Sequence, residues 1–481
     1  MSEGGFKMAD IGLVGLGVMG ANLALNMAEK GNTVAVFNRT AAKTDAFMAH
    51  AGPLAPRLVP TKSLPDLAAA ISDPKPVVLM VTAGPAVDQE AEVLAGVMKP
   101  GDIIIDCGNA NFHDTRRREA EFKAKGIDFL GVGVSGGEEG ARHGPSIMAG
   151  GDPKAWARVE KIFNAIAAKF DGEPCAALCG PDGAGHFVKT IHNGIEYADM
   201  QMIGEVYGVM RDGLGLTAPQ MAEIFAHWNE GPLKSYLIEI TSKVLGVIDE
   251  KTGKPIVDII LDTAGQKGTG RWSAMEAQDL GVPATVIEAA VAARALSSQK
   301  AERVAQEKLF GAAPRKFDTS LNHEAILKAL EGALLGGKIV AYAQGFAVMA
   351  KASETYGWSL PLGTIAKIWR AGCIIRSVFL DDISKAYATS GSAANLMDIE
   401  PFTGLLKANN ESLRLIVAEA LLKGIPMPAL SSALAYFDLS RTARSTADLT
   451  QAQRDFFGAH GFERLDAPGV VSHGPWAMGP G

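Results

Sequence analysis

Short apolar runs rich in β-branched residues alternate with segments of helical periodicity over the first part of the chain. The runs span residues 11–17, 33–38, 77–81, 103–106 and 129–134. Such alternation is typical of βαβ units, in which helices connect parallel strands. The pattern predicts an α/β domain of the Rossmann type, with a mostly parallel, doubly wound sheet.

Beyond about residue 184, long apolar patterns of helical period follow one another and β-rich runs nearly vanish. From residue 442 the periodicity fades, and glycine and proline accumulate near the end. We therefore expect a dinucleotide-binding domain over 1–183 and a large all-α substrate and dimerisation domain over 184–441. An irregular C-terminal tail over 442–481 would need a docking surface to be ordered.

Charge and composition narrow the possible partners. The 481 residues exceed what one hydrophobic core usually supports, and the formal net charge is −7 with a pI near 5.8. This balance leaves no global basic field for nucleic acid or an anionic membrane, so an anionic ligand needs a local basic pocket.

The cysteines and the apolar runs point to the cytoplasm. Four cysteines show neither zinc-like pairing nor the density of a disulfide scaffold, so no metal site and a reducing compartment are expected. Glycines and polar residues interrupt the first apolar run, and charges interrupt the later ones. No membrane span is therefore expected.

A glycine-rich turn closes the first expected strand and opens a helix. It comprises Gly15, Leu16, Gly17, Val18, Met19 and Gly20. Bare backbone there lets a pyrophosphate approach the helix N-terminus. A purely structural role for these glycines is the alternative.

The second expected strand ends in Asn38, Arg39 and Thr40, where NAD-binding versions usually carry an acid for the ribose hydroxyls. A guanidinium suits a 2′-phosphate, so NADP is favoured over NAD. A solvated arginine at a strand end is the alternative.

A polar stripe marks the expected helix that begins near residue 184. Lys189, His192, Asn193, Glu196 and Tyr197 share one helical face, away from most of the apolar positions. We expect this face to meet water, a partner or a cleft. A solvated Lys–Glu pair is the simpler alternative, but a histidine, an amide and a tyrosine are unusual company for it.

Two loops offer anion-binding chemistry. Ser135, Gly136 and Gly137 follow the last β-rich run and leave backbone N–H groups open to a carboxylate. Lys267 and Thr269 lie in a glycine-rich turn that could hold a phosphate. An ordinary loop and an ordinary turn are the respective alternatives.

Taken together, these segments closely resemble the 6-phosphogluconate dehydrogenase family, the decarboxylating enzymes of the oxidative pentose phosphate pathway, over nearly the whole chain. The matching motifs are GLGVMG at 15–20, NRT at 38–40, GVSGGEEGAR at 133–142, GAGHFVKTIHNGIEYADMQ at 183–201, AGQKGTGRW at 264–272, WRAGCIIRSVFL at 369–380 and QAQRDFFGAH at 451–460. Long motifs in the right order are far more specific than a lone glycine-rich turn.

The resemblance implies oxidation of 6-phosphogluconate by NADP and its decarboxylation to ribulose 5-phosphate. Lys189 would be the base at the C3 hydroxyl, and Glu196 would protonate C1 of the enediol. A free lysine titrates near about 10.4, so neutrality near pH 7 needs a shift worth roughly 4 kcal/mol. Partial burial and a nearby cation could supply it.

The resemblance also implies binding roles. Those for the carboxylate and hydroxyls fall on Asn109, Ser135, Gly136, Gly137, His192 and Asn193; those for the 6-phosphate fall on Tyr197, Lys267, Thr269 and Arg294. Arg454 and His460 would come from a second subunit, giving a homodimer with shared active sites. The coenzyme would contact the turn at 15–20, then Asn38, Arg39, Thr40, Val81, Thr82, Ala83 and Asn109. Without the resemblance, Arg294 would be interpreted as an ordinary surface arginine.

Some positions depart from the family pattern. Thr82 stands where the family usually has a lysine near the coenzyme, Ala110, Asn111 and Phe112 replace Ser-Glu-Tyr, and Arg271 replaces a lysine. The chain also diverges after His460. Two other functions stay open: a β-hydroxyacid dehydrogenase for an unphosphorylated substrate, and a redox-sensing NADP-binding protein without catalysis.

Overall fold

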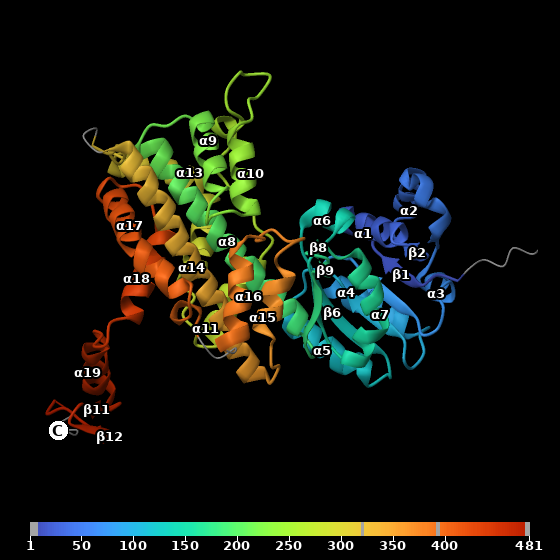
Figure 1. Ribbon diagram of the computed structural model, residues 1–481. Coiled ribbons are helices and arrows are strands. Elements are labelled where there is room, and N and C mark those ends of the chain that lie inside the picture. Colours follow the sequence, from blue (N-terminus) through green and yellow to red (C-terminus); the bar gives the residue numbers. More distant parts are fainter. Residues whose placement is uncertain (1–7, 319–321, 391–394, 477–481) are drawn as a thin grey trace, which may run out of the picture. The chain divides into compact units, whose positions relative to one another are not determined.

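The computed structural model describes residues 8–318, 322–390 and 395–476 (Figure 1). The chain forms two compact units, residues 1–433 and residues 434–481. The first unit contains a strand-rich N-terminal part followed by a helical part, and it holds the polar stripe predicted from the sequence.

Eight of the described strands form one sheet in the order β10-β7-β6-β5-β4-β1-β2-β3. Every neighbouring pair is parallel except β6 and β7. The strands are β1 (Ile11–Val14), β2 (Val34–Phe37), β3 (Leu58–Pro60), β4 (Pro76–Leu79), β5 (Ile103–Asp106), β6 (Asp128–Val134), β7 (Ile147–Gly150) and β10 (Ala176–Gly180). The predicted Rossmann-type fold class is confirmed.

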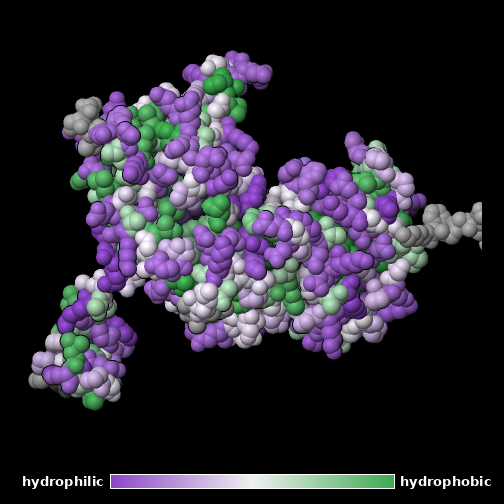
Figure 2. Space-filling view, viewed as in Figure 1, coloured by the Kyte–Doolittle hydropathy of each residue, from purple (hydrophilic) through white to green (hydrophobic). Residues whose placement is uncertain are grey.

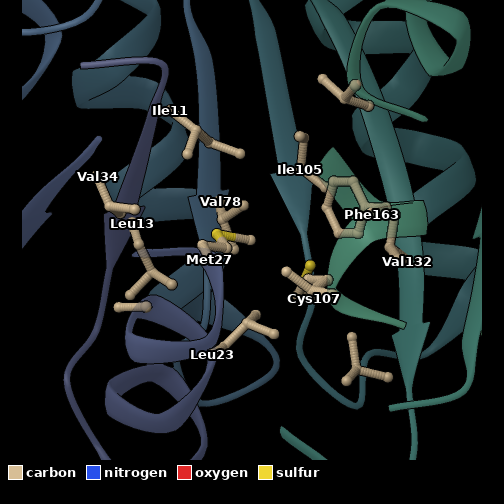
Figure 3. Packing of buried hydrophobic residues seen from close by; sticks show 14 of the residues in the cluster. Ile11, Leu13, Leu23, Met27, Val34, Val78, Ile105, Cys107, Val132 and Phe163 are labelled. Atoms are coloured by element: carbon tan, nitrogen blue, oxygen red, sulfur yellow. The ribbon is translucent and has the colours of Figure 1, made fainter. Parts of the chain in front are cut away.

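Helices cover both faces of this sheet. They are α1 (Val18–Glu29), α2 (Ala41–His50), α3 (Leu64–Ala69), α4 (Pro85–Ala95), α5 (Phe112–Lys123), α6 (Gly137–His143) and α7 (Pro153–Ile166). This part of the chain also contains a 3₁₀ turn at Gly52–Arg57 and a separate pair of short strands, β8 (Lys169–Phe170) and β9 (Glu173–Pro174). On one face Leu13 and Ile105 pack with Met27 of α1 and Phe163 of α7, all at most 1% exposed (Figure 3). The other face packs against α3, α4 and α5.

The five predicted strands are all present, but β3, β7 and β10 were missed. Strand β3 is Leu-Val-Pro, too short to show an alternating pattern. Strand β7 runs antiparallel to β6, which extends the sheet beyond the region of regular βαβ alternation.

The helical part is built around two long helices, α8 (Ala184–Gly208) and α14 (His323–Tyr356), which pack against each other. The first turns of α8 also pack on β6 and β7. The remaining helices are α9 (Ala218–Trp228), α10 (Tyr236–Leu245), α11 (Thr269–Asp279), α12 (Thr285–Ser297), α13 (Lys300–Phe310), α15 (Leu362–Ile368), α16 (Phe379–Ser390), α17 (Phe402–Leu422) and α18 (Pro428–Ser440), with short turns at Val209–Gly213, Ile256–Ile259 and Leu396–Asp398.

Helix α14 is long and apolar enough to cross a membrane by length and composition. However, 89% of its most apolar stretch is buried inside the protein. This burial is what the central helix of a packed helical domain requires.

The second unit spans the tail that was predicted from the sequence to be irregular. Helix α19 (Ala447–Gly458) is followed by an antiparallel pair, β11 (Phe462–Arg464) and β12 (Ala467–Ser472). The buried carboxylate of Asp455 organises this unit, because it accepts hydrogen bonds from the backbone N–H groups of Gly461 and Gly474 at 2.9 and 2.8 Å. It also contacts the rings of His473 and Trp476 at 2.7 and 3.1 Å.

Candidate active site

Lys189 lies at the centre of a buried polar cluster between α8 and the end of β6. Its Nζ donates to the Oδ1 of Asn193 at 2.7 Å and to the Oγ of Ser135 at 3.1 Å, and it lies 3.4 Å from the Nδ1 of His192. The Nε2 of His192 is 3.3 Å from the same Ser135 hydroxyl. Two segments that are 54 residues apart in sequence therefore meet at one amine.

Burial controls the charge of this amine. Lys189 is 7% exposed, and burial lowers its pKa. The groups that act on it electrostatically are the Glu196 carboxyl and the Cys373 thiol, and both favour the charged form. The predicted help from a nearby cation is therefore wrong, because desolvation acts against these neighbours.

The alternative of a solvated helix face for this stripe is wrong. His192 is fully buried, and Asn193 and Tyr197 are 6% and 7% exposed, so the stripe is an interior cluster rather than a solvated helix face. Helix α8 is covered by the sheet and by other helices at once, which the periodicity of one helix cannot reveal.

Glu196 lies two turns beyond Lys189 on α8, with its Oε2 3.9 Å from the Nδ1 of His192. Burial raises the pKa of its carboxyl, and Asp199 adds to this, while Lys189 and Arg294 oppose it. Burial and Lys189 hold the pKa of His192 well below its usual range. The cluster therefore favours a neutral amine, a neutral imidazole and a protonated carboxyl.

Small residues allow the chain to approach the lysine closely. A methyl group at Gly133 would lie 2.5 Å from the Cβ of Lys189. Gly136 has φ +103°, and a methyl group there would lie 2.5 Å from the carbonyl oxygen of Gly372. The ring of Trp369 packs edge-on against His192 with centroids 5.4 Å apart. Residues 369–373 therefore pack against the polar cluster and help to position it.

The residues expected to hold a phosphate gather around Tyr197. The guanidinium of Arg294, on α12, lies 4.5 Å from the ring centroid of Tyr197. Gly270 packs on the same ring, since a methyl group there would lie 2.6 Å from it. Thr269 is the buried first residue of α11, and Lys267 is exposed on the loop just before it.

The glycine-rich turn has the geometry that dinucleotide binding needs. Gly15 has φ +99°, and a methyl group on Gly20 would collide with the carbonyl of Gly15. A methyl group on Gly17, by contrast, would meet no other part of the described chain within 4 Å, so the backbone there is open to a ligand. The Oδ1 of Asn38 accepts the N–H of Leu16 at 3.0 Å, which ties the end of β2 to this turn.

A pocket of about 270 Å³ lies beside this turn. Seven of the residues predicted to contact the coenzyme line this pocket: Gly15, Gly17, Asn38, Arg39, Thr40, Val81 and Thr82. Val18, Met19 and Gly20 form the first turn of α1, while Ala83 and Asn109 follow β4 and β5. A methyl group on Gly108 would lie 3.2 Å from the carbonyl oxygen of Val81, so these two strand ends adjoin.

Two charged residues that line this pocket, Lys43 and Glu90, were not predicted from the sequence. Lys43 follows Arg39 by four residues, a spacing that could have signalled it. Glu90 lies on α4 and carried no signal in the sequence.

Arg454 and His460 belong to the second unit, 434–481. Arg454 lies on α19, where its Nη1 donates to the Oε1 of Gln451 at 2.9 Å, and His460 follows that helix. Both residues are exposed.

A parallel sheet with an open glycine-rich turn, next to a helical domain with a buried lysine and acid, defines a nicotinamide-dependent dehydrogenase. Residues 10–180 match the family described as the NAD binding domain of 6-phosphogluconate dehydrogenase, and residues 185–476 match its C-terminal domain. The chain belongs to the 6-phosphogluconate dehydrogenase family, and it is an oxidoreductase.

Relatives along the full length agree with this membership. Two Bacillus subtilis 6-phosphogluconate dehydrogenases, one named NAD(+)-dependent and one named NADP(+)-dependent, are each 48% identical to this chain over 97% of its length, covering 99% and 98% of theirs. The Plasmodium falciparum 6-phosphogluconate dehydrogenase structure, described with NADP+ and with 6-phosphogluconate, superposes with a TM-score of 0.94 at 41% identity, covering 97% of this chain and all of that one.

Proposed function

We propose that this chain converts 6-phosphogluconate into ribulose 5-phosphate and carbon dioxide while reducing NADP. The observation that carries this proposal is the buried amine of Lys189 with Glu196 on the same helix. The amine has two hydrogen-bond acceptors, Asn193 and Ser135, at 2.7 and 3.1 Å. A neutral amine has two N–H groups, so these contacts leave its lone pair free for a substrate hydroxyl.

Lys189 is the general base in this mechanism. It takes the proton of the C3 hydroxyl as the hydride leaves C3, and burial favours the neutral amine that this step needs. Bound NADP supplies the hydride acceptor. Ser135, His192 and Asn193 position the amine and the substrate hydroxyl.

Glu196 is the general acid. The 3-keto acid loses carbon dioxide by cleavage of its C1–C2 bond, and the protonated Lys189 returns its proton to the C3 oxygen, which leaves an enediol. Glu196 then donates its proton to the terminal carbon that becomes C1 of ribulose 5-phosphate, while Lys189 takes the enediol hydroxyl proton and the ketone forms. Its carboxyl suits this task because burial raises its pKa, and a general acid must keep its proton until the receiving carbon is formed.

Two cradles hold the ends of the substrate. The carboxylate and hydroxyls contact Asn109, Ser135, Gly136, Gly137, His192 and Asn193, and the 6-phosphate contacts Tyr197, Lys267, Thr269 and Arg294. The contact of Arg294 with Tyr197 supports the second cradle, because it places a guanidinium over the aromatic ring against which the N-terminal turn of α11 packs through Gly270.

The pocket beside the glycine-rich turn favours NADP. Two relatives of equal identity carry different coenzymes in their names, so the lining residues must decide. Arg39 and Lys43 supply two cations against one carboxylate, Glu90, and Thr40 adds a hydroxyl. A 2′-phosphate gains from this balance, whereas NAD lacks the group that would use it.

We also propose that the protein is a homodimer whose second unit completes the site of the partner with Arg454 and His460. The second unit exposes large apolar side chains, and Phe456, Phe457 and Leu465 are 68%, 73% and 85% exposed. Hydrophobic residues also reach the surface over the helical part (Figure 2). Such surfaces mark contact sites in soluble enzymes.

The cytoplasm is the expected compartment, because the four cysteines are free and buried. A β-hydroxyacid dehydrogenase for an unphosphorylated acid is not favoured, because Arg294, Thr269 and Lys267 would then have no phosphate to bind.

The decisive experiment follows NADPH absorbance and carbon dioxide release. Purified protein is given 6-phosphogluconate or gluconate, each with NADP or NAD. We expect rapid turnover only with the phosphorylated acid and faster turnover with NADP. Equal turnover of gluconate would replace the proposal by the unphosphorylated alternative.

A further inference from the structure

A buried ion pair lies next to the proposed catalytic acid and takes no part in the mechanism above. The Nζ of Lys338, on α14, lies 2.7 Å from the Oδ2 of Asp199, on α8. Each side chain is only 2% exposed. The other carboxylate oxygen of Asp199, Oδ1, is buried and has no hydrogen-bond partner among the residues that the structure describes.

The pair is close to Glu196 along the helix. Asp199 follows Glu196 by three residues, which is nearly one helical turn, so both side chains lie on the same side of α8. The electrostatic influence of Asp199 reaches the Glu196 carboxyl and also Tyr342, one turn beyond Lys338 on α14.

Packing alone does not explain why a charged pair lies here. Removing two charges from water is costly, and apolar side chains of similar volume often stabilise a protein equally well. A carboxylate oxygen left without a partner adds to this cost. A functional role for the charges is therefore the more economical explanation.

We propose that Asp199 and Lys338 are a positioning pair for Glu196, in which the unpaired oxygen of Asp199 keeps the Glu196 carboxyl in its proton-donating form. The ion pair with Lys338 holds the Asp199 carboxylate in place and compensates most of its negative charge. The inference rests on the proposed function, because it presumes that Glu196 delivers the proton to C1.

Other titratable groups near Glu196 also influence the pKa of its carboxyl in the wild-type protein. On α8 these are Lys189, His192 and Asp199, and on α12 Arg294. On α14, Lys338 pairs with Asp199 and Tyr342 interacts electrostatically with it, and the Cys373 thiol acts on Lys189. Helix α11 packs against α8 through Gly270 and Ser273, which carry no charge. Lys189 and Arg294 draw the proton away from Glu196, and Asp199 opposes them.

The charge that each variant removes determines the direction in which the pKa of Glu196 changes. Asp199→Asn removes a negative charge and leaves the Lys338 cation uncompensated, so Glu196 should lose its proton at lower pH. Asp199→Asn combined with Lys338→Met removes both charges, so the proton affinity of Glu196 should lie between that of the single variant and that of the wild type. A merely structural role predicts instead that the double variant is no better than the single one.

The test is the pH profile of kcat with 6-phosphogluconate and NADP. The limb at high pH should report loss of the proton from Glu196. In Asp199→Asn we expect this limb to move down by about one pH unit, which lowers kcat roughly tenfold above it. In the double variant the limb should lie between these two positions, about half a pH unit below the wild-type position. Lys338→Arg, which keeps the cation, is the matched control and should leave the limb in place.

An infrared titration without turnover separates this inference from the function itself. The C=O band of protonated Glu196 is identified by its loss in Glu196→Gln, and it should titrate at lower pH in Asp199→Asn. An inactive wild-type protein would refute the proposed function. An active wild type with an unmoved band in folded Asp199→Asn, or a double variant whose limb lies at the wild-type position, would overturn the inference alone.

Discussion

The amine of Lys189 and the side-chain oxygen of Asn193 lie 2.7 Å apart, one turn from each other on α8. Both side chains are buried, and the hydrogen bond fixes the direction of the lysine toward the end of β6. The chemistry of the site therefore depends on a contact within one helix, made effective by the layers that enclose it.

Replacing Asn193 by aspartate tests this contact. A carboxylate at the same position would favour the charged lysine and raise its pKa. Because the base must be neutral, the low-pH limb of kcat should move to higher pH by about one unit or more. The pH profile of Asn193→Asp measures this shift, and an unmoved limb would contradict the role of Lys189 as the base.

Lys189→Met removes the base and keeps a side chain of similar shape. General base catalysis contributes about 10²–10⁴-fold, so kcat should fall by at least that order. Coenzyme affinity should change little, because Lys189 does not line the pocket beside the glycine-rich turn. Calorimetric titration with NADP checks this, and Lys161→Met, on the exposed face of α7, is the control.

Arg39→Ala should weaken NADP far more than NAD. A charge-assisted hydrogen bond to a phosphate is worth roughly 1.5–3 kcal/mol, or about ten- to a hundredfold in Kd. Binding of adenosine 2′,5′-bisphosphate and of 5′-AMP isolates the effect from turnover. Equal losses for both ligands would assign Arg39 a structural role only.

Mixed dimers test the shared active site. Lys189→Met and Arg454→Ala subunits are expected to be nearly inactive alone. In a heterodimer, one site combines an intact Lys189 with an intact Arg454 from the partner. Random mixing should then restore roughly a quarter of wild-type activity. A mixture that stays inactive would argue against exchange of the second unit between subunits.

Glu205 should make stability depend on pH. Its buried carboxylate accepts the backbone N–H groups of Ala429 and Leu430 at 2.7 and 2.8 Å, yet burial raises its pKa from 4.5 to about 7. The folded state therefore binds the proton more tightly than the unfolded state. The stability that this provides is complete below about pH 4.5 and is lost as pH rises toward 7.

The variant Glu205→Gln lacks this titration. Its melting temperature relative to wild type should therefore rise between pH 5 and pH 8, by an amount that corresponds to at most roughly 3 kcal/mol. Glu223→Gln, an exposed acid on α9, is the matched control. A constant difference across this range would show that Glu205 does not titrate there.

The fold class and the residues of the polar stripe could be predicted from the amino-acid sequence alone. The alternation of apolar runs predicted five parallel strands, and the spacing of Lys189, His192 and Glu196 placed them on one helix face. Both signals are local, since strand and helix periods depend on neighbouring residues. The motifs at 133–142 and 264–272 further indicated which loops would join them.

The environment of that helix face depends on the tertiary structure and could not be predicted from the sequence. The stripe that looked solvated is buried, because β6, β7, α11, α12 and α14 all pack around α8. Burial in turn lowers the pKa of Lys189, without the cation that was expected. The pairing of Asp199 with Lys338 joins residues 139 positions apart, and Glu90 reaches the coenzyme pocket from another helix. Desolvation and long-range pairing depend on what surrounds a residue in space, which no periodicity along the chain encodes.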